Sequence, residues 1–293
     1  MLTAMVTPMT PDGAVDYEGA GTLAAYLVDE MRNDGLVISG TTGESPTTTD
    51  PEKEQLLRSV LDAVGDRATV LAGVGTNDTA HTIELARQAE RAGAHALLAV
   101  TPYYNKPPQA GLERHFTALA DATSLPVALY DIPGRTGVPI ATETLVRLAE
   151  HPRIVAVKDA KGDLGAGSEV MARTSLVFYS GDDMLNLPWL SVGAAGFISV
   201  VGHVVGDRLH DMIDAYVSGD VAAARAIHQS LLPVYTGVML RTQGVITTKA
   251  ALTLLGLPGG PVRGPLADAT PAQVERLRED LQAGSVKIPG MAA

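Results

Sequence analysis

The chain contains no cysteine among its 293 residues. Disulfide bonds, thiolate metal sites, iron–sulfur clusters and a cysteine nucleophile are therefore excluded. Positive charge is also scarce, since 22 lysines and arginines stand against 33 aspartates and glutamates, giving a formal net charge of −11. This balance argues against a nucleic acid or an anionic membrane as partner. Small anionic substrates stay open, because one pocket of an acidic protein can be locally positive.

Several other signatures are missing. No apolar run reaches membrane length, and the first residues show no charged segment followed by an apolar stretch, so we expect a soluble, cytoplasmic protein. The seven histidines show neither His-Glu-x-x-His nor another spacing typical of zinc, which disfavours metal-dependent aldolase chemistry. Neither a Gly-x-Ser-x-Gly elbow nor a Gly-x-Gly-x-x-Gly fingerprint is present.

What the chain does contain is a regular alternation of short apolar segments with longer amphipathic or alanine-rich ones. The short segments begin every ~20–35 residues, the spacing of βα units. Eight such units predict an α/β protein of the closed (β/α)8 TIM-barrel class rather than an open sheet. The expected strands are 3–6, 35–39, 69–72, 96–100, 127–130, 154–158, 177–180 and 196–200.

The pattern changes after the eighth expected strand, where the chain becomes wholly helical. We expect residues 1–203 to supply the barrel strands and helices. Residues 204–293 would form the last barrel helix and a C-terminal helical extension packed on the barrel. Thr270, three residues before Gln273, has the form of a capping box, and Asp50 before a proline is the expected N-cap of an earlier helix.

One expected strand, 154–158 (IVAVK), ends in a lysine. Side chains alternate faces along a strand, so Lys158 shares a face with Ala156. A buried ammonium is costly, and desolvation lowers its pKa towards a neutral amine, the form that attacks a ketone carbonyl. From this strand alone, a lysine whose head reaches solvent is the favoured interpretation. The other lysines, in polar or helical contexts, compete poorly; they include Lys53, Lys106, Lys161, Lys249 and Lys287.

Polar residues follow the other expected strands, and active sites of this barrel class lie at the C-terminal strand ends. Each has a plainer interpretation: a βα loop, an interface or surface aromatic, a surface arginine, or a helix cap in place of a magnesium ligand. Together with the end of 154–158, these five segments make six strand ends, which favour a site that surrounds an amine with hydroxyls and a carboxylate-binding arginine. The segments are 40–45 (GTTGES), 101–105 (TPYYN), 130–137 (YDIPGRTG), 181–183 (GDD) and 198–199 (IS).

These motifs resemble the dihydrodipicolinate synthase family, one of the pyruvate-dependent, Schiff-base-forming aldolases, over nearly the whole chain. The segments 39–49 and 158–161 look most like actinobacterial members. The resemblance implies a lyase that condenses pyruvate with L-aspartate-4-semialdehyde to give 4-hydroxy-tetrahydrodipicolinate, the first committed step of diaminopimelate and lysine biosynthesis. It implies no cofactor and no metal.

The resemblance also implies residue roles. Lys158 would form the imine with pyruvate, and Tyr130, Thr42 and Tyr104 would relay protons, with Tyr104 contributed by a neighbouring subunit. The same likeness suggests a homo-oligomer, a dimer of dimers. The substrate-binding residues would be Thr41 and Thr42, Arg135 for the semialdehyde carboxylate, Gly181, and the backbone near Ile198.

Two alternatives stay open. Relatives that act on N-acetylneuraminate or on 2-keto-3-deoxy sugar acids keep the lysine and the tyrosine, although Thr41, Thr42 and Arg135 favour the synthase. A barrel that binds a small molecule without turnover is the remote alternative. Lysine-inhibited members use histidines and a glutamate at an allosteric pocket where this chain has Asp50, Lys53 and His81, so we expect weak or absent feedback by L-lysine.

Overall fold

The computed structural model describes residues 1–290. Eight strands close into a barrel in chain order, which confirms the expected TIM-barrel class. The pairings between β1 and β2 and from β3 through β8 are parallel. The strands are β1 (Leu2–Ala4), β2 (Gly35–Ile38), β3 (Thr69–Gly73), β4 (Ala96–Val100), β5 (Val127–Asp131), β6 (Ile154–Asp159), β7 (Val177–Ser180) and β8 (Gly196–Ser199).

Helices follow the strands, and the described chain after β8 is helical, as expected. Among residues 1–290, no helix is long and apolar enough to cross a membrane. The helices are α1 (Tyr17–Asp29), η1 (Ser45–Thr47), α2 (Asp50–Val64), α3 (Thr79–Ala92), α4 (Gln109–Asp121), α5 (Pro133–Thr136), α6 (Thr142–Leu148), α7 (Leu164–Arg173), η2 (Asp183–Leu185), α8 (Asn186–Ser191), α9 (Gly202–Val217), α10 (Val221–Tyr235), η3 (Thr236–Leu240), α11 (Gly244–Leu254) and α12 (Pro271–Ala283).

The chain divides into two compact units. Unit 1 consists of Met1–Ala68 and Ser199–Ala293, and unit 2 of Thr69–Ile198. The predicted boundary near residue 203 therefore differs from this division, and the assignment of 204–293 as an extension stays a prediction.

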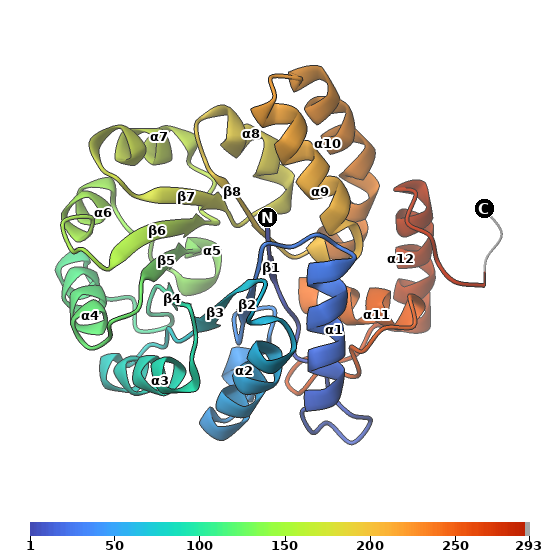
Figure 1. Cartoon of the computed structure of the whole chain (residues 1–293), viewed down its shortest axis with the longest axis horizontal. Coiled ribbons are helices and arrows are strands. Elements are labelled where there is room, and N and C mark those ends of the chain that lie inside the picture. Colours follow the sequence, from blue (N-terminus) through green and yellow to red (C-terminus); the bar gives the residue numbers. More distant parts are fainter. Residues whose placement is uncertain (291–293) are drawn as a thin grey trace. The chain divides into compact units, whose positions relative to one another are not determined.

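Unit 2 contains the strands that carry most of the predicted site. In Figure 1, α3, α4, α6 and α7 follow one another along the outside of strands β3 to β7, and each contacts the next helix in this series. Helix α7 packs closely against Trp189 of α8. The Trp189 ring stacks on Phe178 of β7 with ring centroids 5.7 Å apart, and a Cβ on Gly167 of α7 would lie 2.3 Å from the indole. Only glycine at position 167 lets α7 approach the Trp189 ring this closely.

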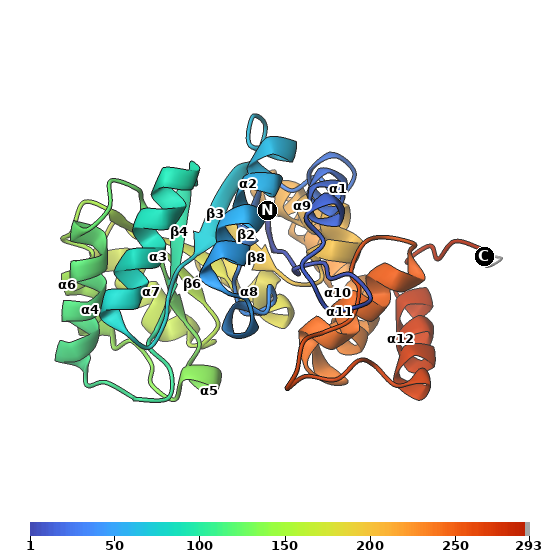
Figure 2. The ribbon, with the colours of Figure 1, turned by 90° about the horizontal axis from the view of Figure 1, so that it is seen from below.

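Unit 1 contains β1, β2 and the C-terminal helices. Figure 2 shows α10, α11 and α12 grouped together, and contacts join α10 to α12 and α11 to α12. The predicted end of the first strand, at residue 6, is wrong, because β1 ends at Ala4. The reason is that the Val6 N–H donates to Nε2 of buried His203, at 3.1 Å, instead of continuing the strand ladder.

Two helix caps were predicted, one correctly. Thr270 caps α12 in a full capping box with Gln273. Asp50, by contrast, is the first residue of α2, and its N-cap is Thr49. The Glu52 carboxylate accepts from the Thr49 N–H at 2.8 Å and the Thr49 hydroxyl accepts from the Glu52 N–H, so the reciprocal cap forms one residue earlier.

Candidate active site

Lys158 lies near the end of β6 with its side chain buried, only 4 % exposed. Tyr130 of β5 and Tyr179 of β7 are its register partners on either side. Residues in register on parallel strands point to the same face. The Lys158 Nζ lies 4.4 Å from the centroid of the Tyr130 ring, so these two predicted residues are in contact.

The surroundings of Lys158 favour its neutral amine. Burial lowers the pKa of Lys158 to about 8; the carboxylate of Asp183 opposes this shift, and the guanidinium of Arg135 adds to it. Near neutral pH, a usable fraction of the side chain is therefore deprotonated. A neutral amine in a desolvated site is the nucleophile that imine formation requires.

Gly181 supplies the space for the lysine side chain. A Cβ at this position would lie 3.0 Å from Lys158 Cγ and 3.1 Å from Cε. The Gly181 N–H also donates to the Asp159 carbonyl at 2.7 Å, which fixes the turn after β7 beside β6. Gly181 was predicted as a substrate-binding residue, and its visible contribution in unit 2 is room for Lys158.

Arg135 is exposed and lies on α5, a helix of four residues directly after β5. The turn is closed by Gly137, whose φ of 79° suits glycine and whose N–H donates to the Pro133 carbonyl at 2.9 Å. The Thr136 hydroxyl donates at 3.1 Å to the carbonyls of Ile132 and Val138. A short, internally bonded turn therefore presents the guanidinium to solvent.

The remaining predicted residues of unit 2 occupy β8 and the loop after β4. Ile198 lies in β8 and is buried. Tyr104 is 88 % exposed, so its ring is not part of the buried cluster around Lys158 in its own chain. Its φ is 72°, and the Asn105 N–H donates to the Tyr103 carbonyl at 2.9 Å, the pattern of a strained γ-turn.

Thr41 and Thr42 belong to unit 1, in the loop that follows β2. Thr42 is buried and Thr41 partly buried. The loop is tightly held, because the Thr7 hydroxyl donates to the Gly43 carbonyl at 2.6 Å and a Cβ on Gly43 would lie 3.1 Å from the Ser39 nitrogen.

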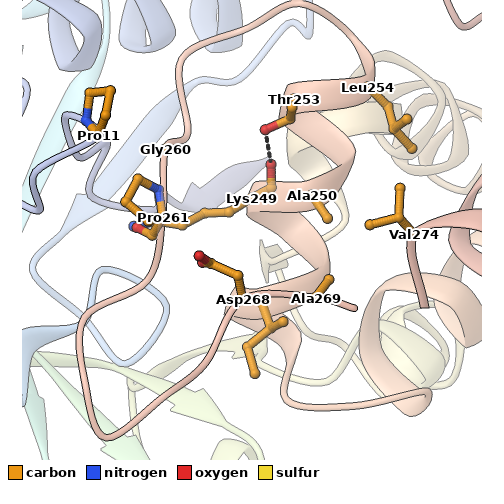
Figure 3. A pocket seen from close by; sticks show the side chains of 11 residues that line it. Pro11, Lys249, Ala250, Thr253, Leu254, Gly260, Pro261, Asp268, Ala269 and Val274 are labelled. Atoms are coloured by element: carbon orange, nitrogen blue, oxygen red, sulfur yellow. Dashed lines mark hydrogen bonds between the residues drawn. The ribbon is translucent and has the colours of Figure 1, made fainter. Parts of the chain in front are cut away.

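The same loop ends in Glu44, which pairs with a second buried lysine. Lys249 on α11 is 2 % exposed, and its Nζ lies 2.6 Å from Glu44 Oε1 and 2.7 Å from the Pro261 carbonyl. Figure 3 shows the Lys249 side chain extending to Pro261 beside a cavity of about 400 Å³. The Arg263 N–H donates to Glu44 Oε2 at 2.8 Å, so both carboxylate oxygens are engaged.

Sequence reasoning missed two features of this environment. Lys249 was expected in a polar or helical context; it is helical but fully buried, and its apolar neighbours on α11 were the available signal. Tyr179 was not singled out, although it precedes Gly181 by two residues and flanks Lys158. No group of three or more histidine, aspartate or glutamate side chains within residues 1–290 is arranged to hold a metal ion.

We expect Gly181→Ala to impair Lys158. The added Cβ would displace the lysine side chain, so imine formation with pyruvate should slow by about tenfold or more. Gly21→Ala is the matched control, because its Cβ would meet Ala63 Cβ at an ordinary 3.6 Å. Rapid-quench borohydride trapping measures the rate, and an unchanged rate in Gly181→Ala would contradict the role given to this glycine.

Lys249→Met should destabilise the protein without removing the nucleophile. Glu44 would keep a buried carboxylate without its ion-pair partner, a loss of about 3–5 kcal/mol for a broken buried pair. Arg58→Met is the control, because the Arg58–Glu54 pair is exposed and contributes below about 0.5 kcal/mol. Thermal unfolding followed by circular dichroism compares the variants, and equal melting temperatures would show that the buried pair is dispensable.

Comparison with known proteins identifies the family of the chain. The model of the Dihydrodipicolinate synthetase family matches residues 1–284. The chain is 68 % identical over 288 residues to 4-hydroxy-tetrahydrodipicolinate synthase 2 of Streptomyces coelicolor, covering 98 % of this chain and 96 % of the relative.

Two solved structures are similar throughout. The dihydrodipicolinate synthase of Cyanidioschyzon merolae with lysine bound is 41 % identical, with a TM-score of 0.94 and 98 % of each chain covered. A monomeric dihydrodipicolinate synthase variant is 35 % identical, with a TM-score of 0.93, and the match covers 98 % of this chain and 96 % of the other. The fold, the buried lysine with its tyrosine and these full-length matches agree: the chain belongs to the dihydrodipicolinate synthase family.

Proposed function

We propose that this protein is an enzyme that condenses pyruvate with L-aspartate-4-semialdehyde to give 4-hydroxy-tetrahydrodipicolinate, through an imine on Lys158. The observation that carries the proposal is the amine itself: it is buried, its pKa is lowered to about 8, and an aromatic ring lies beside it. Family membership supports the synthase activity, and the same family supports lysine and diaminopimelate biosynthesis as its role. The same likeness supports a cytoplasmic enzyme.

The proposed reaction starts with attack of the neutral Lys158 amine on the C2 ketone of pyruvate. Loss of water gives the imine, and loss of a methyl proton gives the enamine. The enamine carbon then attacks the aldehyde carbon of the semialdehyde, whose oxygen takes up a proton to become the hydroxyl. Finally the substrate's own amine adds to the imine carbon, and Lys158 leaves as the free amine.

Tyr130 is the proposed proton carrier closest to this chemistry. Its ring lies against the Lys158 amine, and both side chains are buried. A phenol can donate and accept the protons that water loss and enamine formation require. We propose Thr42 and Tyr104 as the other members of the relay, from their match to the family motif.

Arg135 is the proposed partner of the semialdehyde carboxylate. Its guanidinium is exposed on a rigid turn and acts on the Lys158 amine electrostatically, which supports a place in the same site. The planar fork suits two parallel hydrogen bonds to a carboxylate. For the pyruvate carboxylate we propose Thr41, Thr42 and the backbone near Ile198, with Gly181 beside the lysine.

Weak or absent inhibition by L-lysine remains part of the proposal. The Lys53 ammonium is engaged within its own chain, donating to the Thr48 carbonyl and lying 4.0 Å from Asp50. A cationic effector near these residues would meet a positive charge that is already fixed in place.

Activity on a panel of substrates tests the proposed function. Pyruvate with L-aspartate-4-semialdehyde should turn over, whereas cleavage of N-acetylneuraminate or of a 2-keto-3-deoxy sugar acid should be at least about a hundredfold slower. Lys158→Arg should abolish turnover, because arginine stays protonated. For the wild type, kcat/KM for pyruvate should rise with pH and level off above about 8, as the amine loses its proton.

Faster cleavage of a sugar acid would replace the synthase with the retro-aldol alternative. Pyruvate binding without turnover of any acceptor would support the silent barrel instead. A pH profile that is flat between 6 and 9 would contradict the neutral-amine mechanism.

We propose from the family likeness that Tyr104 acts in a neighbouring subunit, and its exposure and positive φ support the proposal. Tyr104→Phe should lower kcat by about a hundredfold, as expected for a lost proton carrier. Lys158→Arg and Tyr104→Phe subunits, when co-refolded in equal amounts, should regain about a quarter of wild-type activity, because half of the randomly paired dimers hold one complete site. No recovery on mixing would place Tyr104 in its own subunit's site.

A further inference from the structure

Two charged side chains in unit 2 hold both polar backbone groups of one residue, Ile140. The Asp131 carboxylate accepts from the Ile140 N–H, with both oxygens 3.2 Å from the nitrogen. The Lys161 ammonium lies 3.5 Å from the Ile140 carbonyl oxygen and 3.6 Å from Asp131 Oδ2. Ile140 is itself fully buried. We call Asp131 and Lys161 the Ile140 clamp.

The clamp stands in a setting that is unfavourable for its charges. Asp131 is fully buried, and burial raises the pKa of its carboxyl to about 6, while the Lys161 ammonium opposes the shift. The contact with Lys161 is long for an ion pair. Buried pairs of this kind commonly add little to stability compared with apolar replacements. Stability alone therefore does not explain this pair.

The clamp joins the two ends of the segment 131–140, which carries Arg135. This segment leaves β5 at Asp131, forms the four-residue α5, and returns at Ile140. A helix this short has no stability of its own. Figure 2 shows α5 at one end of the unit 2 strands, separate from the row of longer helices. The orientation of α5 therefore depends on how the two ends of the segment 131–140 are fixed. The clamp fixes Ile140, at one end, to Asp131, at the other.

The clamp is also tied to the strands of the reactive lysine. Asp131 and Asp159 are register partners, each one residue beyond Tyr130 and Lys158, so they lie on the opposite face of the same two strands. Asp159 accepts from the Lys161 N–H at 3.0 Å and thereby holds the lysine's backbone against β6. The Arg135 turn is thus fastened to the back of the Tyr130–Lys158 pair.

We propose that Asp131 and Lys161 are positioning residues that fix Arg135 for binding the carboxylate of the second substrate. The inference rests on the proposed function, because it assumes that Arg135 binds that carboxylate. It assigns no contact with substrate to the clamp itself. The clamp acts through the geometry of the turn from residue 131 to residue 140.

A purely structural role makes a different prediction. If the clamp only filled the protein interior, its loss would lower stability and affect pyruvate and semialdehyde kinetics together. A positioning role instead separates the two substrates, since pyruvate reacts at Lys158 and only the acceptor depends on Arg135.

The decisive variant is Asp131→Asn, which keeps the shape and an acceptor for the Ile140 N–H but removes the charge that faces Lys161. We expect KM for L-aspartate-4-semialdehyde to rise about tenfold, the size of one weakened charge-assisted hydrogen bond. KM for pyruvate and borohydride trapping on Lys158 should stay within about twofold. Because the Lys161 side chain is 16 % exposed and can be hydrated, the melting temperature should fall less than in Lys249→Met. Arg147→Gln, which removes an exposed ion pair with Glu113 in the same unit, is the matched control.

The pH dependence supplies a readout that a structural role would not move. The charged groups facing Asp131 are Lys161 and Asp159. As the pH falls through about 6, Asp131 takes up a proton, so the wild-type KM for the semialdehyde should rise towards that of Asp131→Asn. The variant should lack this step. Parallel pH profiles in the two proteins would overturn the proposal.

Arg135→Lys separates this inference from the proposed function. If Arg135→Lys leaves KM for the semialdehyde unchanged, the carboxylate role of Arg135 is wrong and the clamp's role falls with it. If Arg135→Lys raises that KM but Asp131→Asn does not, the clamp alone is refuted. A rise in both, with pyruvate kinetics preserved, supports both.

Discussion

The structure depends on a lysine amine that is buried near the end of a strand with an aromatic ring beside it. Burial lowers the pKa of Lys158 to about 8 against the opposing effect of the Asp183 carboxylate, and the Tyr130 ring centroid lies 4.4 Å from the amine. Gly181 leaves room for the side chain, and Arg135 adds positive potential. Burial and the Arg135 guanidinium both favour the neutral amine at physiological pH.

The second buried lysine, Lys249, has a different environment from Lys158. Burial also lowers the pKa of Lys249, but Glu44 at 2.6 Å and the Pro261 carbonyl satisfy its ammonium. One lysine thus anchors the loop after β2 to α11, while the other retains a reactive nitrogen. Burial alone therefore does not identify a nucleophile, because the partner of the buried amine decides its chemistry.

Much of the fold and of the reactive centre could be predicted because the signals are local. The apolar run that ends in Lys158 and the regular spacing of the strands are visible in consecutive residues. What could not be predicted depends on register or on distant pairing. Tyr179 flanks Lys158 only because of the offset between β6 and β7. Glu44 and Lys249 form an ion pair although they lie far apart in the sequence. The N-cap of α2 is Thr49 and not Asp50, because the Thr49 side chain accepts from the Glu52 N–H.

Peptide mapping after reduction of the pyruvate adduct with sodium borohydride tests the account most directly. The chain offers three lysines in contrasting settings: Lys158 beside a ring, Lys161 beside the Asp131 carboxylate, and Lys249 paired with Glu44. The account predicts one reduced pyruvyl group per chain, on Lys158. An adduct on Lys161 or Lys249, or no adduct, would contradict the claim that the buried amine beside the Tyr130 ring is the nucleophile.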